Sequence, residues 1–436
     1  MQIICFEDNR VLHLAPITQS RPAYAVTCAS LRLIDRLSLL VKGPSSGGGL
    51  SGNTLLGDVR DFLADIQKLD YQIDPVAKRV DGSWKIDDDG ILLVNARLVP
   101  RLELDEILKE VAAETRSLCM VDDADGSVLI ARWTAADLAA KRSLLTSETD
   151  ESFTELLVKE SERLQRSPYS PSAFHWPHEI VSWHMNEMRD SVEWRVANGN
   201  YKQLSDGVFV ADGVSLGDYL SINVENGPIV LESNVKVGPF CYLEGPLYAG
   251  ANTKVIEHSA IKDGVSLGHT VKIGGEVEAS VIEPYTNKQH HGFLGHSYLG
   301  SWINLGAGTC NSDLKNTYGK INMEYGNEKI ATGMQFVGCF IGDYSKSAIN
   351  TSIFTGKTIG VCSMLYGFVT SNVPSFVNYA RLFGQTALLP TDVMIATQSK
   401  MFARRKVQQR ECDKQLILDM YNLSAFERET PENEML

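Results

Sequence analysis

The sequence contains no long uninterrupted run of apolar residues. No stretch approaches the roughly eighteen apolar residues that predict a membrane-spanning helix. The first residues, MQIICFEDNR, lack the basic start and the apolar core of a secretory signal peptide. The eight cysteines are scattered and include no CxxC pair, so we expect reduced thiols rather than a disulfide framework. Together these absences predict a cytoplasmic protein that has no membrane partner.

Positive charge is also scarce. The chain has 41 Lys and Arg against 54 Asp and Glu, a formal net charge of -13 at pH 7. This balance argues against nucleic acid as the main partner. Anionic small molecules remain possible partners, because local lysines and backbone amides bind phosphate whatever the net charge. With 436 residues, the chain exceeds what one hydrophobic core organises, so roughly two or three domains are expected.

The second half of the chain has a repeat of six residues. Apolar residues occupy every sixth position from Val237 to Ile273, at Leu299 and Leu305, and again from Ile341 to Leu365, where Ser347 is an exception; glycine often follows them. This period fits neither a helix nor an alternating strand. It is typical of a parallel β-helix, in which three hexapeptides form one triangular coil. We predict a β-helix from about residue 205 to about residue 375, with the glycines adopting positive φ at the coil corners.

Two segments depart from this repeat. Residues 310–333 (CNSDLKNTYGKINMEYGNEKIATG) are polar and out of phase, so we expect them to leave the coil as a loop. After Tyr366 the repeat fades, and residues 398–423 predict one amphipathic helix that is basic at its start. We expect this helix to cap or pack against the last coils, whose edge would otherwise be exposed.

Residues 1–195 instead alternate between β-rich and helical runs. The β-rich runs are MQIICF, GILLVNARLV and GSVLIARW, and the helical runs are GDVRDFLADIQKL, LDEILKEVAAET and ESFTELLVKESERL. This alternation favours an α/β domain with a mostly parallel sheet. The proline-rich residues 166–179 predict a hinge, and residues 179–196 predict a connecting helix. We therefore expect an α/β domain with its linker helix (1–195), a β-helix (196–376) and a C-terminal extension (377–436).

The glycine-rich residues 43–53 (GPSSGGGLSGN) suggest comparison with a phosphate-binding loop. They match neither GxxxxGK[ST] nor a GxGxxG motif that follows a clear strand. We interpret them as a surface loop, with ligand contact as the alternative.

Several longer stretches resemble a known family. They are YTNKQHHGFLGHSYLGSWINLGAGTCNSDLKNTYG (285–319), FED (6–8) with PITQSRP (16–22), ILLVNARLVP (91–100), and the stretch from Trp176 to Asp190. The sequence is similar to the bifunctional bacterial enzymes that make UDP-N-acetylglucosamine, and more narrowly to their divergent UDP-N-acetylglucosamine diphosphorylase/glucosamine-1-phosphate N-acetyltransferase branch. The resemblance implies a nucleotidyltransferase-like α/β domain, a left-handed parallel β-helix of hexapeptide repeats and a C-terminal helix. It also implies a homotrimer with active sites between columns, acetyl-CoA as co-substrate, and Mg²⁺ for nucleotidyl transfer.

The same resemblance assigns roles within GHSYLG and LGAGT. The assigned residues are the general base His296, the substrate-contacting Tyr298 and Asn304, and Gly306, Ala307 and Gly308 along the acetyl-CoA groove. Acetyl transfer to an amine needs a base for the amine proton, and an imidazole, with an ordinary pKa of about 6.5, suits that task at neutral pH. Backbone amides at a glycine-rich corner can stabilise the developing oxyanion. A surface histidine at a turn is the alternative for His296.

Further cationic residues are candidate phosphate ligands, with solvated side chains as the alternative. They are Lys288 and Lys315 beside this run, and Arg404, Arg405 and Lys406, which would meet coenzyme phosphates if the C-terminal helix folds back. His290 and His291 could pair at a metal, but adjacent side chains in an extended strand point to opposite faces.

This chain departs from the better-known branch of the family in both halves. Residues 310–313, CNSD, replace an asparagine-tyrosine-aspartate run, and the opening LAAGxGTRM with its lysine is absent, so no catalytic lysine is transferred. Arg21 is the candidate substrate ligand in the first domain, because an arginine fork matches a phosphate and Pro22 fixes the backbone after it; a surface ion pair or a helix cap is the alternative. Asp8, Asp122 and Asp123 are candidate Mg²⁺ ligands, since nucleotidyl transfer generally needs a hard cation held by carboxylates.

Three functions fit the sequence. The first is a sugar-nucleotide enzyme that N-acetylates glucosamine-1-phosphate, transfers uridylyl from UTP to N-acetylglucosamine-1-phosphate, or does both. The second is a nucleotidyltransferase whose β-helix only oligomerises or regulates, and the third is a catalytically silent scaffold. A scaffold needs the apolar positions and the glycines but no histidine in HSYLG, which favours a transferase. Its expected partners are a sugar phosphate, acetyl-CoA and a nucleoside triphosphate.

Overall fold

The computed structural model describes residues 1–43, 50, 52–76, 90–141, 152–326, 328–380 and 385–428. Most of the glycine-rich stretch 43–53 therefore lies outside the described residues. The chain forms two compact units. The first comprises Met1–Leu12, Arg21–Val26 and Leu31–His175, and the second comprises His13–Ser20, Thr27–Ser30 and Trp176–Leu436. The units divide before the linker helix, which was predicted to belong to the first domain.

A seven-stranded sheet forms the centre of the first unit, in the order β3-β2-β1-β4-β6-β5-β7. Its strands are β1 (Gln2–Phe6), β2 (Thr54–Asp58), β3 (Asp74–Pro75), β4 (Ile91–Asn95), β5 (Leu118–Val121), β6 (Val128–Trp133) and β7 (Gln165–Arg166). Strands β3, β2, β1 and β4 are parallel, and β6 is antiparallel to both β4 and β5. Every residue of β1, β4 and β6 is buried, as expected for central strands covered on both faces. The α/β prediction is confirmed.

Short helices connect these strands. They are α1 (Leu33–Lys42), α2 (Ala64–Asp70), α3 (Leu104–Ala113), α4 (Ala135–Ala140) and α5 (Phe153–Ser161), with 3-10 turns at Asn9–Leu14, Ala23–Ala25 and Asp61–Leu63. Helix α5 starts at a capping box, in which Ser152 Oγ accepts from Glu155 N and the Glu155 carboxylate accepts from Ser152 N. The run GDVRDFLADIQKL was predicted as one helix, but its first two residues end strand β2.

The carboxyl ends of β1, β2, β4 and β5 lie at one edge of this sheet, because these strands share one direction. The chain runs from β1 to β2 on one side and then to β4 on the other, so the strand order reverses between β1 and β4. Open α/β sheets bind ligands at such a switch point, outside the carboxyl ends of the strands. We call this edge the carboxyl edge.

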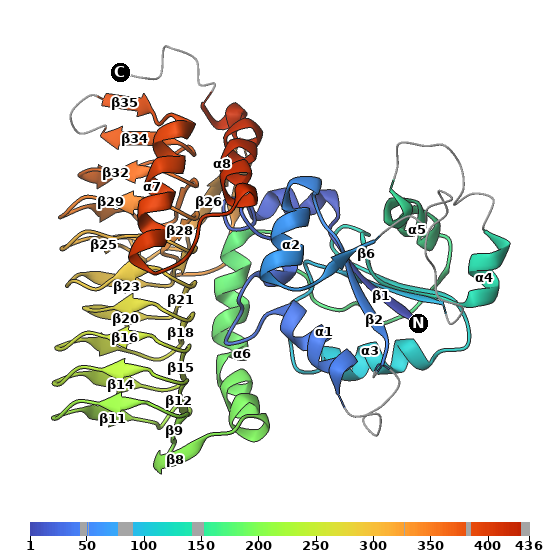
Figure 1. Cartoon of the computed structure of the whole chain (residues 1–436), viewed down its shortest axis with the longest axis horizontal. Helices are drawn as coiled ribbons and strands as arrows, with labels where there is room; N and C mark the ends of the chain where they lie inside the picture. The colour runs from blue at the N-terminus through green and yellow to red at the C-terminus, as the bar shows by residue number, and fades with distance from the viewer. Residues whose placement is uncertain are drawn as a thin grey trace. The chain divides into compact units, whose positions relative to one another are not determined.

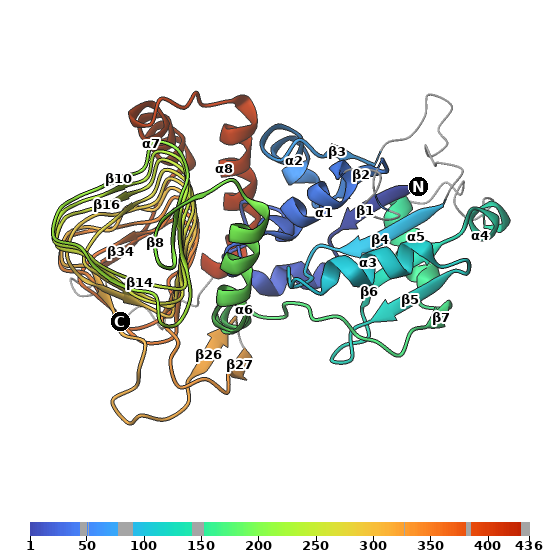
Figure 2. The same cartoon turned by 90° about the horizontal axis from the view of Figure 1, so that it is seen from below.

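Most of the second unit is a parallel β-helix, whose coils superpose as a triangle when viewed along the column (Figure 2). The first side contains β8 (Lys202–Ser205), β9 (Val208–Val210), β12 (Ile229–Leu231), β15 (Leu247–Ala249), β18 (Val265–Leu267), β21 (Ser280–Ile282), β24 (Tyr298–Leu299), β28 (Cys339–Ile341) and β31 (Lys357–Ile359). The second side contains β10 (Ser215–Leu216), β13 (Lys236–Val237), β16 (Lys254–Val255), β19 (Lys272–Ile273), β22 (Asn287–Lys288), β29 (Lys346–Ser347), β32 (Met364–Leu365), β34 (Val377–Ala380) and β35 (Gln385–Leu388). The third side contains β11 (Ser221–Asn223), β14 (Tyr242–Glu244), β17 (Ala260–Ile261), β20 (Glu276–Glu278), β23 (Phe293–Gly295), β25 (Cys310–Asn311), β30 (Ser352–Ile353) and β33 (Phe368–Val369).

The six-residue repeat corresponds to the core of these coils. The apolar positions from Val237 to Ile273, and the later ones from Leu299 to Leu365, are all buried in one hydrophobic cluster. Parallel pairing stacks them in columns, as where Val237, Val255 and Ile273 follow one another on the second side. Each coil therefore buries its apolar face against the next, which is how a solenoid is stabilised.

The glycines that follow the apolar positions have a different role from the one predicted. At Gly238, Gly268 and Gly306 the φ angle is not positive, but an added Cβ would lie 2.6 Å from backbone or proline-ring atoms of the next coil. Positive φ occurs two residues further on, at non-glycine residues such as Phe240 and Trp302. These glycines thus permit close stacking of the coils, and the corners themselves accept side chains.

Helix α6 (Pro177–Asn198) runs along the first side of the column, where it packs on β12, β15 and β21 (Figure 1). Met188 and Val192 of this helix form a buried cluster with Val230 of β12 and with Ala29 from the N-terminal sequence. The helix predicted over 179–196 is therefore present, and it covers one face of the β-helix.

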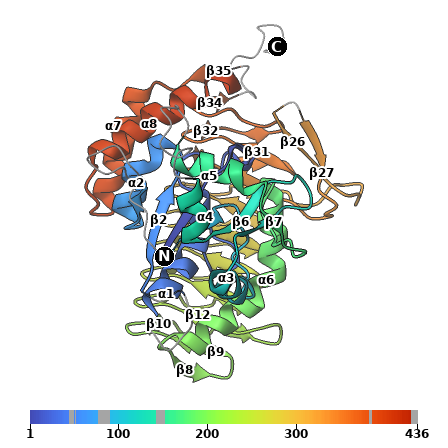
Figure 3. The same ribbon diagram turned by 90° about the vertical axis from the view of Figure 1, so that its right-hand side faces the viewer.

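The polar segment 310–333 leaves the coils as predicted, but it is not a simple loop. Cys310 and Asn311 still pair within the third side. Beyond them, β26 (Asn322–Tyr325) and β27 (Glu328–Ala331) form an antiparallel hairpin outside the column (Figure 3). The Tyr325 ring stacks on Trp176, with ring centroids 5.0 Å apart, and its hydroxyl lies 2.9 Å from His178 Nδ1. The insertion is thus anchored at the start of α6.

The C-terminal prediction of one helix over 398–423 is wrong. Two helices, α7 (Thr391–Arg404) and α8 (Glu411–Leu423), are followed by a 3-10 turn at Ala425–Arg428. The helical path ends where Lys406 adopts a φ of 57°, a left-handed conformation that no glycine or proline announces in the sequence. Phe402 of α7 contacts Trp302 and Tyr421 of α8 contacts Phe376, so both helices pack against coil residues as expected.

Candidate functional site

His296 lies at the corner where strand β23 of the third side leads into β24 of the first side. Its Nδ1 atom is 2.8 Å from Asp313 Oδ2, and its ring stacks on Phe336 with centroids 5.2 Å apart. Asp313 and Phe336 are at the two ends of the insertion, where Val337 N donates to Asp313 O. The insertion thus brings a carboxylate and an aromatic ring to the predicted base.

This arrangement sets the chemistry of the imidazole. A carboxylate beside Nδ1 favours the tautomer that carries its proton there, which leaves Nε2 of the neutral ring as a proton acceptor. Nε2 of His296 has no hydrogen-bond partner within the described ranges. The side chain is about one-fifth exposed, so the acceptor remains open to a ligand. A histidine held in this way can act as a general base.

Two of the predicted ligand residues are instead inside the protein. The Tyr298 ring is fully buried, its hydroxyl donates to Glu283, and it accepts a bond of 3.4 Å from Thr27 N. Lys288 pairs in register with Ile273, so it occupies an inward position of the coil. Its Nζ donates to Gly274 O and His290 O, and burial lowers the pKa of the amine to about 8. In a single chain, both residues make structural contacts.

A pocket of about 250 Å³ lies on the second side and its corner with the first side. It is lined by Lys272, Tyr285, Asn287, Gln289, Trp302, Ile303, Asn304, Lys346, Met401, Arg404 and Arg405. We call it the cationic pocket, because it contains four cationic side chains and, among the described residues, no Asp or Glu. Burial lowers the pKa of Lys272 and Arg405, and it lowers the pKa of Lys346 to about 8. An anion bound in the pocket would reduce the electrostatic repulsion among these four positive charges.

The remaining pocket wall is aromatic and amide. The rings of Tyr285 and Trp302 stack with centroids 4.1 Å apart. Asn287 Nδ2 donates to Asn304 Oδ1, while Asn287 Oδ1 is buried without a hydrogen-bond partner in the described part of the chain. Stacked rings, an unpaired amide oxygen and clustered cations suit a ligand that has both a planar group and phosphates.

The other candidates of the second unit are dispersed. The corner between the second and third sides contains Gly306, Ala307 and Gly308. Gly308 has a φ of 75°, and close stacking on the next coil is sufficient to explain why residue 306 is a glycine. Lys315 Nζ donates to Lys320 O within the insertion. The adjacent His290 and His291 are exposed and belong to no group of three metal-binding side chains among the described residues.

In the first unit, Asp8 follows β1 at the carboxyl edge, but its carboxylate is occupied by an arginine. Arg97 Nε and Nη2 donate to its two oxygens at 2.8 and 2.7 Å, and Asn95 Nδ2 donates to Oδ2. The Arg97 side chain is completely buried. Because Arg97 already neutralises it, Asp8 does not fit the role of a Mg²⁺ ligand for which the sequence proposed it.

Arg21 lies near the Glu7 carboxylate, which accepts several hydrogen bonds from its surroundings. The Glu7 carboxylate accepts from Ala23 N, Arg60 N and the Arg60 guanidinium, and Arg60 also donates to Arg21 O. Arg21 itself is 5% exposed. These contacts fix the backbone from Arg21 to Ala23 beside the carboxyl edge.

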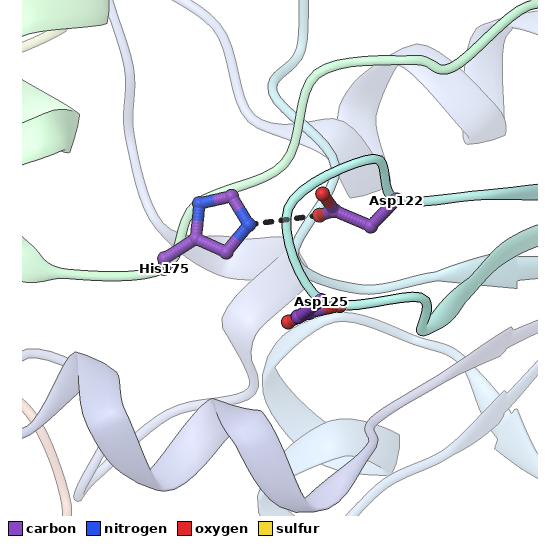
Figure 4. Close-up of side chains that lie close together, drawn as sticks. All are labelled: Asp122, Asp125 and His175. Atoms are coloured by element: carbon purple, nitrogen blue, oxygen red, sulfur yellow. Dashed lines mark hydrogen bonds and ion pairs between the residues drawn. The ribbon is translucent and has the colours of Figure 1, made fainter.

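Asp122 lies close to two other side chains that can bind a metal, Asp125 and His175, and of the three only Asp122 was a candidate from the sequence. Its Oδ2 lies 2.8 Å from His175 Nε2, and Asp125 lies on the same β5–β6 loop (Figure 4). One ligand atom from each of the three residues lies within 4.8 Å of the others. Asp123, the other sequence candidate, is exposed and outside this group. Two carboxylates and an imidazole fit a divalent cation, which would supply charge neutralisation beside phosphate oxygens.

Sequence reasoning missed several members of these sites. Asp313 was noticed only as a departure from the family motif, and Phe336 not at all. Lys346 directly precedes Ser347, the exception to the repeat, and nothing around it in the sequence indicated a pocket. His175 was interpreted as part of a hinge. Asp125 had the one usable signal, since a carboxylate three residues after Asp122 in a turn can face the same ligand.

The part of the chain that ends with helix α6 matches a known protein family. Residues 3–198 match the family described as sugar nucleotidyl transferase. The chain is 27% identical over 175 residues to a bifunctional sugar-1-phosphate nucleotidylyltransferase/acetyltransferase of Sulfurisphaera tokodaii, covering 40% of this chain and 43% of the relative. It is 31% identical over 115 residues to the bifunctional protein GlmU of Ralstonia pickettii, covering 26% of this chain and 24% of the relative. The chain thus spans less than half the length of these curated relatives.

A solved structure of the UDP-N-acetylglucosamine acyltransferase of Francisella novicida aligns with 52% of this chain and 75% of its own, at 10% identity and a TM-score of 0.25. The β-helix is established by the strand pairing of this chain itself. Within the described ranges, none of the helices combines the length and the apolar character needed to cross a membrane. All eight cysteines are free, as the sequence led us to expect. Residues 3–198 are thus similar to the sugar nucleotidyl transferase family, and the same chain carries a parallel β-helix.

Proposed function

We propose that this protein is a transferase with two active sites in UDP-N-acetylglucosamine synthesis. In the β-helix, it moves the acetyl group of acetyl-CoA to the amine of glucosamine-1-phosphate. In the first unit, it moves uridylyl from UTP to N-acetylglucosamine-1-phosphate and releases pyrophosphate. The observation that carries the proposal is the His296–Asp313 pair at a coil corner, because a β-helix that served only as a scaffold would not need an oriented imidazole.

The acetyl transfer follows from this pair. His296 Nε2 takes a proton from the sugar amine as its nitrogen attacks the thioester carbonyl, and Asp313 stabilises the imidazolium that forms. The carbon–sulfur bond then breaks, and the His296 imidazolium returns its proton to the leaving sulfur, so that the coenzyme departs as a thiol and the base is regenerated. The stacked Tyr285 and Trp302 and the four cations of the cationic pocket suit the base and phosphates of the coenzyme.

The same geometry supports a homotrimer. His296 is at the corner between the third and first sides, whereas the cationic pocket is at the corner between the first and second sides. Helix α6 packs over the first side, which separates them. One chain therefore presents its base and its pocket at different corners, and a neighbouring copy can bring a second pocket to the base. Light scattering at micromolar concentration should give the mass of three chains.

The carboxyl edge of the first unit supports nucleotidyl transfer. It is a switch point of an open α/β sheet, and residues 3–198 match the sugar nucleotidyl transferase family. Arg21 is the proposed phosphate ligand, and Mg²⁺ is the cation that such transfers generally use. The group of Asp122, Asp125 and His175 also lies at this edge.

The proposal is tested by product analysis. Pure protein is incubated with glucosamine-1-phosphate, acetyl-CoA, UTP and Mg²⁺, and the products are identified by mass spectrometry. UDP-N-acetylglucosamine is the expected product, and omission of acetyl-CoA should abolish it unless N-acetylglucosamine-1-phosphate is supplied. If only N-acetylglucosamine-1-phosphate supports product formation, the β-helix is an oligomerisation or regulatory module and the acetyl-transfer half of the proposal fails.

A further inference from the structure

The group Asp122, Asp125 and His175 has features of a built site. The two aspartate side chains are 7% and 8% exposed, and that of His175 is 24% exposed. Asp122 Oδ1 accepts from Ala124 N, and Asp125 Oδ1 accepts from Ser127 N. Each carboxylate is thus fixed through one oxygen by a backbone amide of the β5–β6 loop, while Oδ2 of Asp122 faces the imidazole.

A cation already lies against this group. Arg10 Nε is 3.1 Å from Asp125 Oδ2, and the Arg10 side chain is 44% exposed at the protein surface. Two nearly buried carboxylates attract positive charge, and here an exposed arginine supplies it. A metal ion entering the site would compete with Arg10 for Asp125, and the exposed arginine can turn into solvent.

The donor set selects the kind of ion. Mg²⁺ prefers oxygen ligands throughout, whereas an imidazole suits Mn²⁺, Zn²⁺ and other transition metals. Three protein ligands leave further coordination positions for water or phosphate oxygens. We propose that Asp122, Asp125 and His175 form a binding site for a divalent transition-metal ion, with Arg10 as the cation that the metal displaces.

This inference concerns metal binding alone, so it does not depend on the uridylyl transfer proposed above. If both are correct, the ion lies at the carboxyl edge, where the phosphates of UTP would approach. Metal binding and product formation are therefore measured separately. Failure of one leaves the other intact.

The test uses the full-length protein and Mn²⁺, whose free ion gives an electron paramagnetic resonance signal that weakens on binding. Asp125→Asn and His175→Gln should each weaken Mn²⁺ binding by at least about tenfold, because loss of outer-shell partners alone typically costs that much. Asp123→Asn, an exposed neighbour on the same loop, should bind as the wild type does. Arg10→Gln should bind Mn²⁺ more tightly, since it removes the competing charge.

Two controls keep the result interpretable. Glu278, His296 and Asp313 form another group with metal-binding side chains, so all titrations are repeated in a His296→Asn background. Thermal unfolding without metal shows whether each variant is folded, and the rise in unfolding temperature on adding Mn²⁺ should shrink for Asp125→Asn but not for Asp123→Asn. The proposal is overturned if protein whose only substitution is His296→Asn leaves millimolar Mn²⁺ free. It is equally overturned if folded Asp125→Asn and His175→Gln bind as tightly as Asp123→Asn, or if Arg10→Gln weakens binding.

Discussion

Asp313 Oδ2 lies 2.8 Å from Nδ1 of His296, although the two residues belong to different coils of the β-helix. The carboxylate comes from the first residues of an insertion that leaves the column and returns at Val337. The insertion is anchored elsewhere by the stack of Tyr325 on Trp176. The position of the proposed base therefore depends on how the insertion packs, as well as on the coil that carries the histidine.

We expect His296→Asn to lower acetyl transfer by about 10²–10⁴-fold, the usual range for loss of a general base. Asparagine keeps a polar group of similar size but cannot accept the amine proton near neutral pH. The KM for acetyl-CoA should change little, because the coenzyme is proposed to bind in the cationic pocket. Steady-state release of the coenzyme thiol measures both constants. Near wild-type turnover would show that His296 only shapes the corner.

Asp313→Asn should lower kcat for acetyl transfer by about 10–100-fold, because it removes the charge that orients and stabilises the imidazolium. As a positioning residue, Asp313 should leave the KM for acetyl-CoA unchanged. Ser312→Ala is the matched control, since Ser312 is the exposed neighbour of Asp313 and donates to Leu314 O. Equal losses in both variants would mean that the substitutions disturb the insertion rather than the base.

The cationic pocket should bind acetyl-CoA more weakly as the pH rises through about 8. Burial lowers the pKa of Lys346 to about 8, so its positive charge is present below that pH and is lost above it. Calorimetric titration with acetyl-CoA between pH 7 and 9, roughly one unit on each side, follows this loss. Lys346→Met should bind weakly throughout and lose the pH dependence. Lys400→Met should behave as wild type, because Lys400 is an exposed residue of helix α7 that does not line the pocket. A pH dependence that survives in Lys346→Met would assign it to another group.

Asp8→Ala should destabilise the first unit by about 3–5 kcal/mol, because it leaves the buried Arg97 guanidinium without its carboxylate. Asp123→Ala, an exposed aspartate of the β5–β6 loop, should change stability by less than about 0.5 kcal/mol. Scanning calorimetry resolves the effect if the two units unfold separately, and only the transition of the first unit should move. An unchanged transition for Asp8→Ala would show that Arg97 finds other partners.

Arg21→Ala should slow pyrophosphate release from UTP by about 10–100-fold, as expected for loss of one charged hydrogen bond worth roughly 1.5–3 kcal/mol. Cleavage of acetyl-CoA by the same protein should continue at the wild-type rate, because the acetyl-transfer residues are in the other unit. Arg21→Lys keeps the charge without the planar fork. Its rate of pyrophosphate release should lie between those of the wild type and of Arg21→Ala. If the acetyl-CoA reaction falls in parallel, the substitution acts through folding, since Arg21 is nearly buried.

Much of the fold was predictable from local patterns. The positions from Val237 to Ile273 had to be apolar because every coil buries the same position against the next, so the repeat of six appears directly in the sequence. The runs that became β1, β4 and β6 were equally clear, because strands buried on both faces are apolar throughout. The histidine at the coil corner could also be selected, from its setting among the repeats and from the family resemblance.

The partners of these residues were decided by tertiary structure. Lys288 seemed available to a phosphate, but the strand pairing places it in register with Ile273, inside the column. The break between α7 and α8 depends on one left-handed residue, Lys406, which carries no glycine or proline signal. Asp313 reaches His296 from the next coil, and His175 reaches Asp122 across 53 positions of the chain, so both contacts depend on the tertiary fold. Periodicity records what each residue contributes to its own strand, whereas pairs of this kind arise from long-range packing, on which the local sequence places almost no constraint.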